Sequence, residues 1–198
     1  MNMWKKLLMG SLVLGTVVSC NGSVVQGMVP VAVTPSVEGL RMSVDYTKNT
    51  TTGVTGVTVT RNSGTVKFAA FPGSAGFQVQ RYKIETFDES LTQLATIEHT
   101  LAVSVEAPPL SGTGAGQVKT TTAALPQDPL FPDEVQQHYV NLCLSNYLDP
   151  NRGVDDPVCP KLKVRFTFTG ISLADQTTKN VTATFDFQPG FSYTVTGG

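Results

Sequence analysis

Apolar and polar residues alternate along most of the chain after residue 40, which is the pattern of strands with one buried face. The clearest example is the run from Leu162 to Phe168, where basic residues and threonine separate the apolar positions. The run from Val181 to Phe187 has the same period, and a short polar segment joins the two. We therefore expect an antiparallel hairpin with a phenylalanine-rich inner face.

One strand changes its parity halfway along. In the segment FQVQRYKIETF, Phe77 and Val79 face one way, whereas Tyr82 and Ile84 have the opposite parity. A strand can place both pairs on one face only if an extra residue is inserted between them. The pattern therefore predicts a β-bulge near Gln80–Arg81.

Other short alternating runs complete the body. Residues 57–60 and 66–70 read as strands, and we expect Asn62-Ser63-Gly64 to be the turn between them. Residues 101–105 and 191–195 read as two further strands. The stretch Pro108–Gln137 reads as long loops, with a strand at Gln117–Ala124 and one helical turn at Asp133–His138.

Short strands separated by turn signals are typical of a two-sheet sandwich. The arrangement resembles the immunoglobulin and fibronectin type III architectures, although no tryptophan lies on a central strand, since Trp4 is the only one. The resemblance implies an all-β, immunoglobulin-like antiparallel β-sandwich. We assign residues 40–198 to this domain and find neither an internal repeat nor a second domain boundary.

The first residues have the features of an export signal. Lys5 and Lys6 precede the uncharged run Leu7–Val18. This run is shorter than the about 20 apolar residues that cross a bilayer, but it suits the apolar part of a signal peptide. We expect residues 1–19 to be removed on export.

The end of this signal, Val17-Val18-Ser19-Cys20, resembles the lipobox of bacterial lipoprotein precursors. The resemblance implies cleavage before Cys20, a diacylglycerol on its thiol and an acyl chain such as palmitate on its amine. An ordinary signal peptide that ends near a chance cysteine is the alternative. Residues 20–39 would then be the lipidated cysteine and a tether leading into an edge strand. Asparagine rather than aspartate at position 21 favours the outer membrane, facing the periplasm or the cell surface.

The chain has three cysteines, so lipidation of Cys20 leaves one pair, Cys143 and Cys159. An oxidising envelope permits a disulfide between them. A two-cysteine metal site is the alternative, but the only histidines that could complete it are His99 and His138.

Charge argues against nucleic acid as a partner. Loss of Lys5 and Lys6 reduces the 14 basic residues to 12 against 15 acidic ones, a formal charge of −3. The sequence has no basic patch of the kind that binds phosphate backbones.

The segment between the cysteines, LSNYLDPNRGVDDPV, is the best candidate for a ligand site. Calcium loops place oxygen ligands at alternate positions around a glycine. The glycine here comes one residue early, and Arg152 opposes a cation. A solvated surface loop is the alternative reading. The candidate calcium ligands are Asp149, Asn151, Asp155 and Asp156.

No catalytic motif is recognisable. The loop Gly73-Ser74-Ala75-Gly76 is not a nucleophile elbow, and both histidines read as surface residues near strand ends. We therefore expect a non-enzymatic envelope lipoprotein that serves as an interaction or scaffolding module, held to the membrane by its lipid and bound to an envelope protein. The alternatives are a calcium- or glycan-binding module at the 143–159 loop, and a hydrolase with an unrecognised site. No cofactor is expected, calcium excepted.

Overall fold

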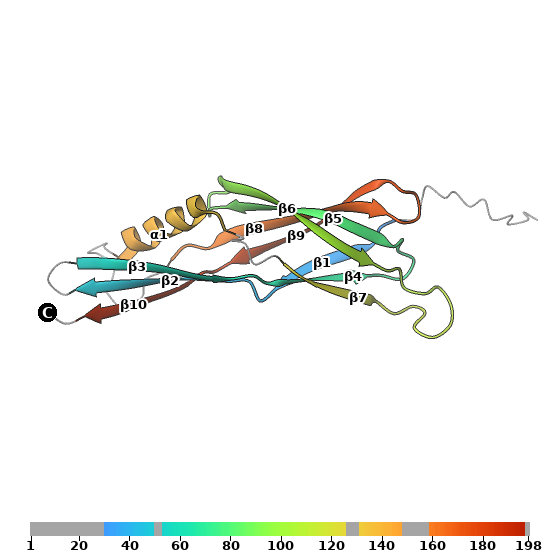
Figure 1. Cartoon of the computed structure of the whole chain (residues 1–198), viewed down its shortest axis with the longest axis horizontal. Coiled ribbons are helices and arrows are strands. Elements are labelled where there is room, and N and C mark those ends of the chain that lie inside the picture. Colours follow the sequence, from blue (N-terminus) through green and yellow to red (C-terminus); the bar gives the residue numbers. More distant parts are fainter. Residues whose placement is uncertain (1–29, 50–52, 126–130, 148–158, 197–198) are drawn as a thin grey trace, which may run out of the picture.

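The fold is described by a computed structural model that covers residues 30–49, 53–125, 131–147 and 159–196. Most of these residues lie in strands (Figure 1). The elements of the described ranges are β1 Val33–Glu38, β2 Arg41–Asn49, β3 Gly53–Asn62, β4 Thr65–Ala70, β5 Phe77–Phe87, β6 Gln93–Val105, β7 Lys119–Ala124, α1 Asp133–Tyr147, β8 Leu162–Ser172, β9 Thr178–Phe187 and β10 Gly190–Thr196.

Two antiparallel sheets form the sandwich. One has the strand order β1-β4-β7 and the other the order β6-β5-β8-β9. Their apolar faces meet in the core, where the ring of Phe68 in β4 packs edge-on against Phe168 in β8, with centroids 5.0 Å apart. Tyr82, Phe166 and Phe168 are also fully buried, so the alternating runs of the sequence supply this core.

The strand order is that of an immunoglobulin-like sandwich, as the sequence predicts. Taken in chain order, β1, β4 and β7 occupy the places of strands A, B and E, and β5, β8 and β9 those of C, F and G. The seventh strand of the two sandwich sheets, β6, pairs with β5 rather than with β7. It therefore belongs to the C-F-G sheet.

Two local predictions are confirmed in detail. The last hairpin pairs Leu162 with Phe187 and Phe168 with Val181. The register of β5 shifts between Val79 and Arg81 against both of its neighbours, which places the predicted bulge at Gln80. The predicted strand at 117–124 is present as β7, and the expected first edge strand is β1, which contains Pro35.

The predicted turn at Asn62-Ser63-Gly64 is wrong. β1 pairs with β4 from Val33↔Ala70 to Glu38↔Thr65, and β2 continues with β3 from Arg41↔Asn62 in the same register. Residues 33–49 and 53–70 are therefore the two sides of one long hairpin, and Asn62-Ser63-Gly64 lies where it passes from one sheet to the next. The same residue types that make turns also permit a close backbone crossing, so the sequence alone did not separate the two cases.

The continuation of this hairpin forms a third sheet, with the order β10-β2-β3. β10 follows β9 after Gln188 and Pro189, and it runs parallel to β2. The sheet therefore extends strands of the sandwich beyond one of its ends, and α1 lies along it (Figure 1). We call β2, β3, β10 and α1 the arm.

The helix is longer than expected. A single turn at Asp133–His138 is predicted, whereas α1 runs for 15 residues, from Asp133 to Tyr147. Val135, Tyr139 and Cys143 recur at every fourth position and are fully buried. This short apolar stripe, in a segment otherwise rich in polar residues, is a helical period that is easily overlooked. Within the described residues, no helix is long and apolar enough to cross a membrane.

Replacement of Gly64 by alanine should destabilise the fold at the crossing. A Cβ on Gly64 would press against the carbonyl oxygen of Glu38 and lie 3.0 Å from the amide nitrogen of Leu40, neither of which can move freely. We expect Gly64→Ala to lower the free energy of unfolding by about 2 kcal/mol or more, measured by urea denaturation. Gly56→Ala is the control, because its Cβ would meet only Thr47 at 3.6 Å. Equal stability of the two variants would contradict the crossing.

Glu85 should contribute stability that acid removes. Its buried carboxylate contacts Arg165 at 2.8 Å and Lys83 at 3.1 Å, and the hydrogen bond from Arg165 lowers its pKa. The contribution is complete above pH 4.5, the ordinary pKa of glutamate, and is lost as the pH falls through the lowered pKa. We expect Glu85→Gln to cost on the order of 1 kcal/mol at neutral pH and progressively less in acid.

The control for Glu85 is Glu38→Gln, since the pair of Glu38 with Lys67 is exposed on both sides. Thermal melts of the three proteins between neutral and acid pH would measure the difference. A Glu85→Gln deficit that stays constant down to the lowest pH at which the fold survives would contradict the assignment.

Candidate functional site

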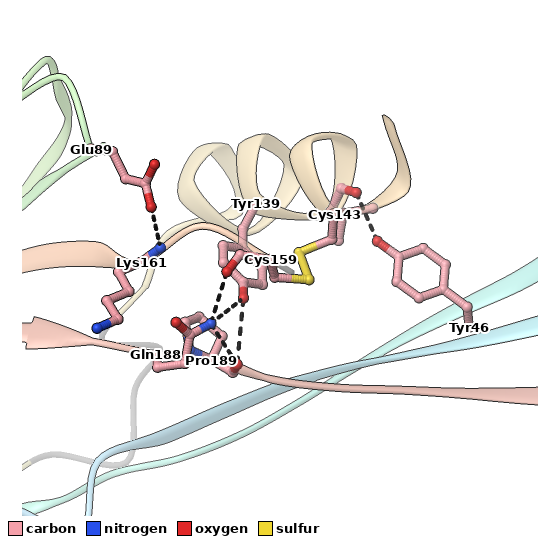
Figure 2. Close-up of a disulfide and its surroundings, with 9 residues drawn as sticks. Tyr46, Glu89, Tyr139, Cys143, Cys159, Lys161, Gln188 and Pro189 are labelled. Atoms are coloured by element: carbon pink, nitrogen blue, oxygen red, sulfur yellow. Dashed lines mark hydrogen bonds between the residues drawn. A yellow bond between two sulfur atoms is a disulfide. The ribbon is translucent and has the colours of Figure 1, made fainter. Parts of the chain in front are cut away.

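The predicted disulfide is present and fastens the arm. Cys143 of α1 is bonded to Cys159, which lies just before β8, and both cysteines are buried (Figure 2). The bond ties the helix to the sandwich sheet across a separation of 16 residues. The two-cysteine metal site is therefore excluded.

Hydrogen bonds from two buried tyrosines connect α1 to the strands of the arm. Tyr46 of β2 donates its hydroxyl hydrogen bond to the carbonyl of Val140 at 2.7 Å, and Tyr139 donates to the carbonyl of Pro189 at 3.4 Å (Figure 2). Burial raises the pKa of Tyr46 to about 12, and burial likewise raises the pKa of Tyr139. Both hydroxyls therefore remain donors at any physiological pH.

Gln188 bonds the link between β9 and β10 to the chain beside the disulfide. Its amide nitrogen donates to the carbonyl of Cys159 at 3.1 Å (Figure 2). This residue lies in the link between β9 and β10, so the strand that enters the arm is bonded to the chain beside the disulfide. The helix, the disulfide and the strand link thus form one fixed unit.

A groove runs between this helix and β3. It has a volume of about 430 Å³, and Val57 and Val59 of β3 form one wall. The residues that α1 contributes are mainly uncharged: Asp133, Gln136, Gln137 and Val140. Val57 is 43% exposed, which is high for a valine inside a strand. The groove is therefore lined by valines and amides, with one carboxylate near the start of the helix.

The outer edge of β3 borders this groove. β3 ends the order β10-β2-β3, and within the described ranges β2 is the strand that pairs with it. The backbone groups on the far side of β3 therefore face outward. Between Gly53 and Thr60 this edge has neither a proline nor a charged residue.

The sandwich edges differ from this edge. Proteins usually protect an open edge strand from unwanted pairing with charges or proline. β1 has Pro35 and Glu38, and each of the other sandwich edges carries at least one charged residue: Glu98 in β6, Lys119 in β7, and Lys179 and Asp186 in β9. Both edges of the arm sheet lack this protection, β3 over its first eight residues and β10 throughout, and the edge of β3 is the one that borders the groove.

The two histidines lie in different places from those expected. His99 is inside β6, paired with Tyr82 and half-buried against its ring, at a centroid distance of 5.3 Å. His138 is on α1, beside a cavity of about 340 Å³ that Ser90 and Asp88 also line. Neither histidine is at a strand end. Ser90 donates its hydroxyl to Asp88 at 2.7 Å, so these groups are not ordered as a serine–histidine–aspartate relay.

The remaining predicted site residues lie outside the described ranges. These are the lipidation residue Cys20 and the candidate calcium ligands Asp149, Asn151, Asp155 and Asp156. Their roles stay predictions. The edge of β3 and its groove were not identified from the sequence, although the uncharged run Val54–Thr60 was a usable signal.

No family model matches the chain, and no curated protein matches it. Among solved structures, the chain is similar to one described as the crystal structure of a protein from Archaeoglobus fulgidus. The two are 13% identical, the match covers 77% of this chain and 97% of the other, and the TM-score is 0.35. A likeness at this level carries no argument about function.

Removal of the disulfide should loosen the arm and lower stability. In the chain-entropy model a loop of this size contributes roughly 3 kcal/mol. We expect the double variant Cys143→Ala with Cys159→Ala to lose about this free energy of unfolding in denaturant titrations. A reductant should weaken the parent protein similarly and leave the double variant unchanged. A reductant effect on the variant would show that the loss has another source.

Proposed function

We propose that this protein is a membrane-anchored lipoprotein of the bacterial envelope, held by a lipid on Cys20, whose arm binds an extended segment of another envelope protein. It acts as an interaction module and performs no reaction. The observation that carries the proposal is the unprotected edge of β3 beside the groove of α1. Backbone groups that face outward along such an edge can accept one more strand from a partner.

The groove indicates which side chains the added strand should have. Side chains on the helix side would contact Val57, Val59 and Val140, so we expect aliphatic residues there. The opposite face continues a polar surface, on which Thr58 and Thr60 are exposed. The partner segment should therefore alternate apolar and polar residues, with a basic residue where it passes Asp133.

A second copy of this chain fits the edge less well. Two-fold pairing of β3 with itself would be antiparallel, so the two sandwiches would lie at opposite ends of a shared sheet. Two chains that both stand upright on one membrane could not adopt that arrangement. A flexible segment of a different protein has no such restriction.

The proposal is tested by a photo-reactive amino acid placed at Val57 in the lipidated chain, in the cells that produce it. We expect one discrete crosslinked product from position 57. The matched control is Leu91, which is 62% exposed on the turn between β5 and β6 and lies beside Lys161 and Asp186, outside the groove at β3. The substitution Val57→Lys, in a chain with the photo-reactive group at Val59, should abolish the product, because a charge at an edge opposes strand addition.

Hydrogen exchange then distinguishes strand addition from other contacts. In the purified complex, amide protection should rise along Gly53–Asn62 and stay unchanged in β6, an edge that remains open. Equal crosslinking from positions 57 and 91 would refute the binding edge. A product that proves to be a dimer of this chain would refute the partner that we propose.

A further inference from the structure

Exposed apolar side chains gather at the end of the sandwich away from the arm. The exposed fraction is 84% for Leu110, 48% for Val118 and Leu173, and 42% for Phe71. Of the large apolar residues that are exposed in the described ranges, only Val57 and Leu91 lie elsewhere. Single exposed apolar residues need no explanation, but a cluster at one end does.

Strand pairing places the four residues at one end of the sandwich. They belong to the loops 71–76, 106–118 and 173–177, which follow β4, β6 and β8. At this end Ala70 pairs with Lys119, and Phe77 pairs with both Val105 and Ser172. All three loops therefore leave the sheets at the same end, which Figure 1 shows opposite the tip of the arm.

These loops have little net charge. Glu106 and Asp175 are their only ionisable residues, and each is paired with a lysine on the adjoining strand, Lys119 and Lys179 respectively. The turn at the opposite end of β5 differs, since it begins with Asp88 and Glu89. An apolar and electrically balanced surface can enter the headgroup region of a membrane at low electrostatic cost.

The chain enters the fold at this same end. The carbonyl of Pro30 accepts a hydrogen bond from the amide of Ala75, and the carbonyl of Ala32 accepts one from the amide of Phe71, each at 3.0 Å. Pro30 is ten positions after Cys20 in the chain. Such a segment reaches at most about 35 Å and spans roughly 17 Å on average if flexible. A lipid on Cys20 would therefore hold this end close to the bilayer.

We propose that this end of the sandwich docks on the lipid bilayer, with Leu110, Phe71, Val118 and Leu173 entering its interface. The inference rests on the Cys20 anchor of the proposed function. The anchor supplies most of the attachment, and the apolar loops fix the orientation. The arm then points away from the membrane, towards the partner.

Tryptophan fluorescence tests the docking directly. Trp4 is the only tryptophan and leaves with residues 1–19, so a variant of the mature chain has a single reporter. Leu110→Trp is compared with Leu91→Trp, a matched change of an exposed leucine at the other end. The lipidated proteins are purified from membranes and placed in phosphatidylethanolamine–phosphatidylglycerol vesicles that contain brominated acyl chains. We expect quenching and a blue shift for Leu110→Trp, and neither for Leu91→Trp.

A second measurement keeps the result independent of the reporter. The mature chain with Cys20→Ser has no lipid and should still bind vesicles weakly. Adding Leu110→Ser should weaken that binding by roughly tenfold, as expected for loss of one side chain that enters the bilayer. Leu91→Ser should leave it unchanged.

The outcomes separate the two proposals. If mass spectrometry finds no lipid on Cys20, the anchor fails, and the docking is tested by coupling that thiol to a maleimide lipid. If the lipid is present but neither reporter is quenched, the docking fails and the anchor stands. Equal quenching of both reporters would mean that the molecule lies flat, which also overturns it. A blue shift of Leu110→Trp without vesicles, together with a dimer in sedimentation, would show that a second copy covers this end.

Discussion

The close approach of two backbones at Gly64 and Glu38 is the constraint on which the rest of the fold depends. The register of residues 33–70 is the same on both sides of this crossing, so one hairpin serves two sheets. A side chain at Gly64 would hold the strands apart, and Gly39 takes a positive φ of 73° at the facing position. The amide of Leu125, just after β7, donates to the carbonyl of Gly64 at 3.0 Å, so β7 also ends at this crossing.

The helix and the disulfide are needed because the hairpin continues beyond the sandwich as the sheet β10-β2-β3. A three-stranded sheet that runs past the end of a sandwich has no second sheet to cover its apolar face. Met42, Val44 and Tyr46 of β2 would be exposed there, yet all three are buried. The helix α1 lies over this part of the molecule, and Cys143 with Tyr46 holds it in place. Because α1 lies beside β3 without covering its edge, the groove and the open edge arise from the same arrangement.

The sequence specified local structure better than long-range connection. Period-2 runs identified the strands, and the parity change between Val79 and Tyr82 located the bulge, because side-chain alternation is a local property. The disulfide followed from a count of cysteines. The conformation of Asn62-Ser63-Gly64 could not be read from the sequence in this way. A turn and a sheet crossing use the same residue types and differ only in which strand lies opposite. The edge of β3 was missed for the same reason. An unprotected edge is visible only once the pairing partners of every strand are known.

The two ends of the molecule differ in the kind of surface that they leave uncovered. At one end, loops with little net charge present whole apolar side chains, which suits a fluid partner without directional bonds. At the other, β3 presents outward-facing backbone groups beside small aliphatic residues, which suits a partner that forms directional hydrogen bonds in register. The hairpin that connects these ends keeps one register from Val33↔Ala70 to Thr47↔Gly56, so its strands stay paired where they pass from one sheet to the next. If the two ends bind as we propose, a force on the bound segment would reach the membrane end through this paired backbone, which is the mechanical property that a scaffolding role requires.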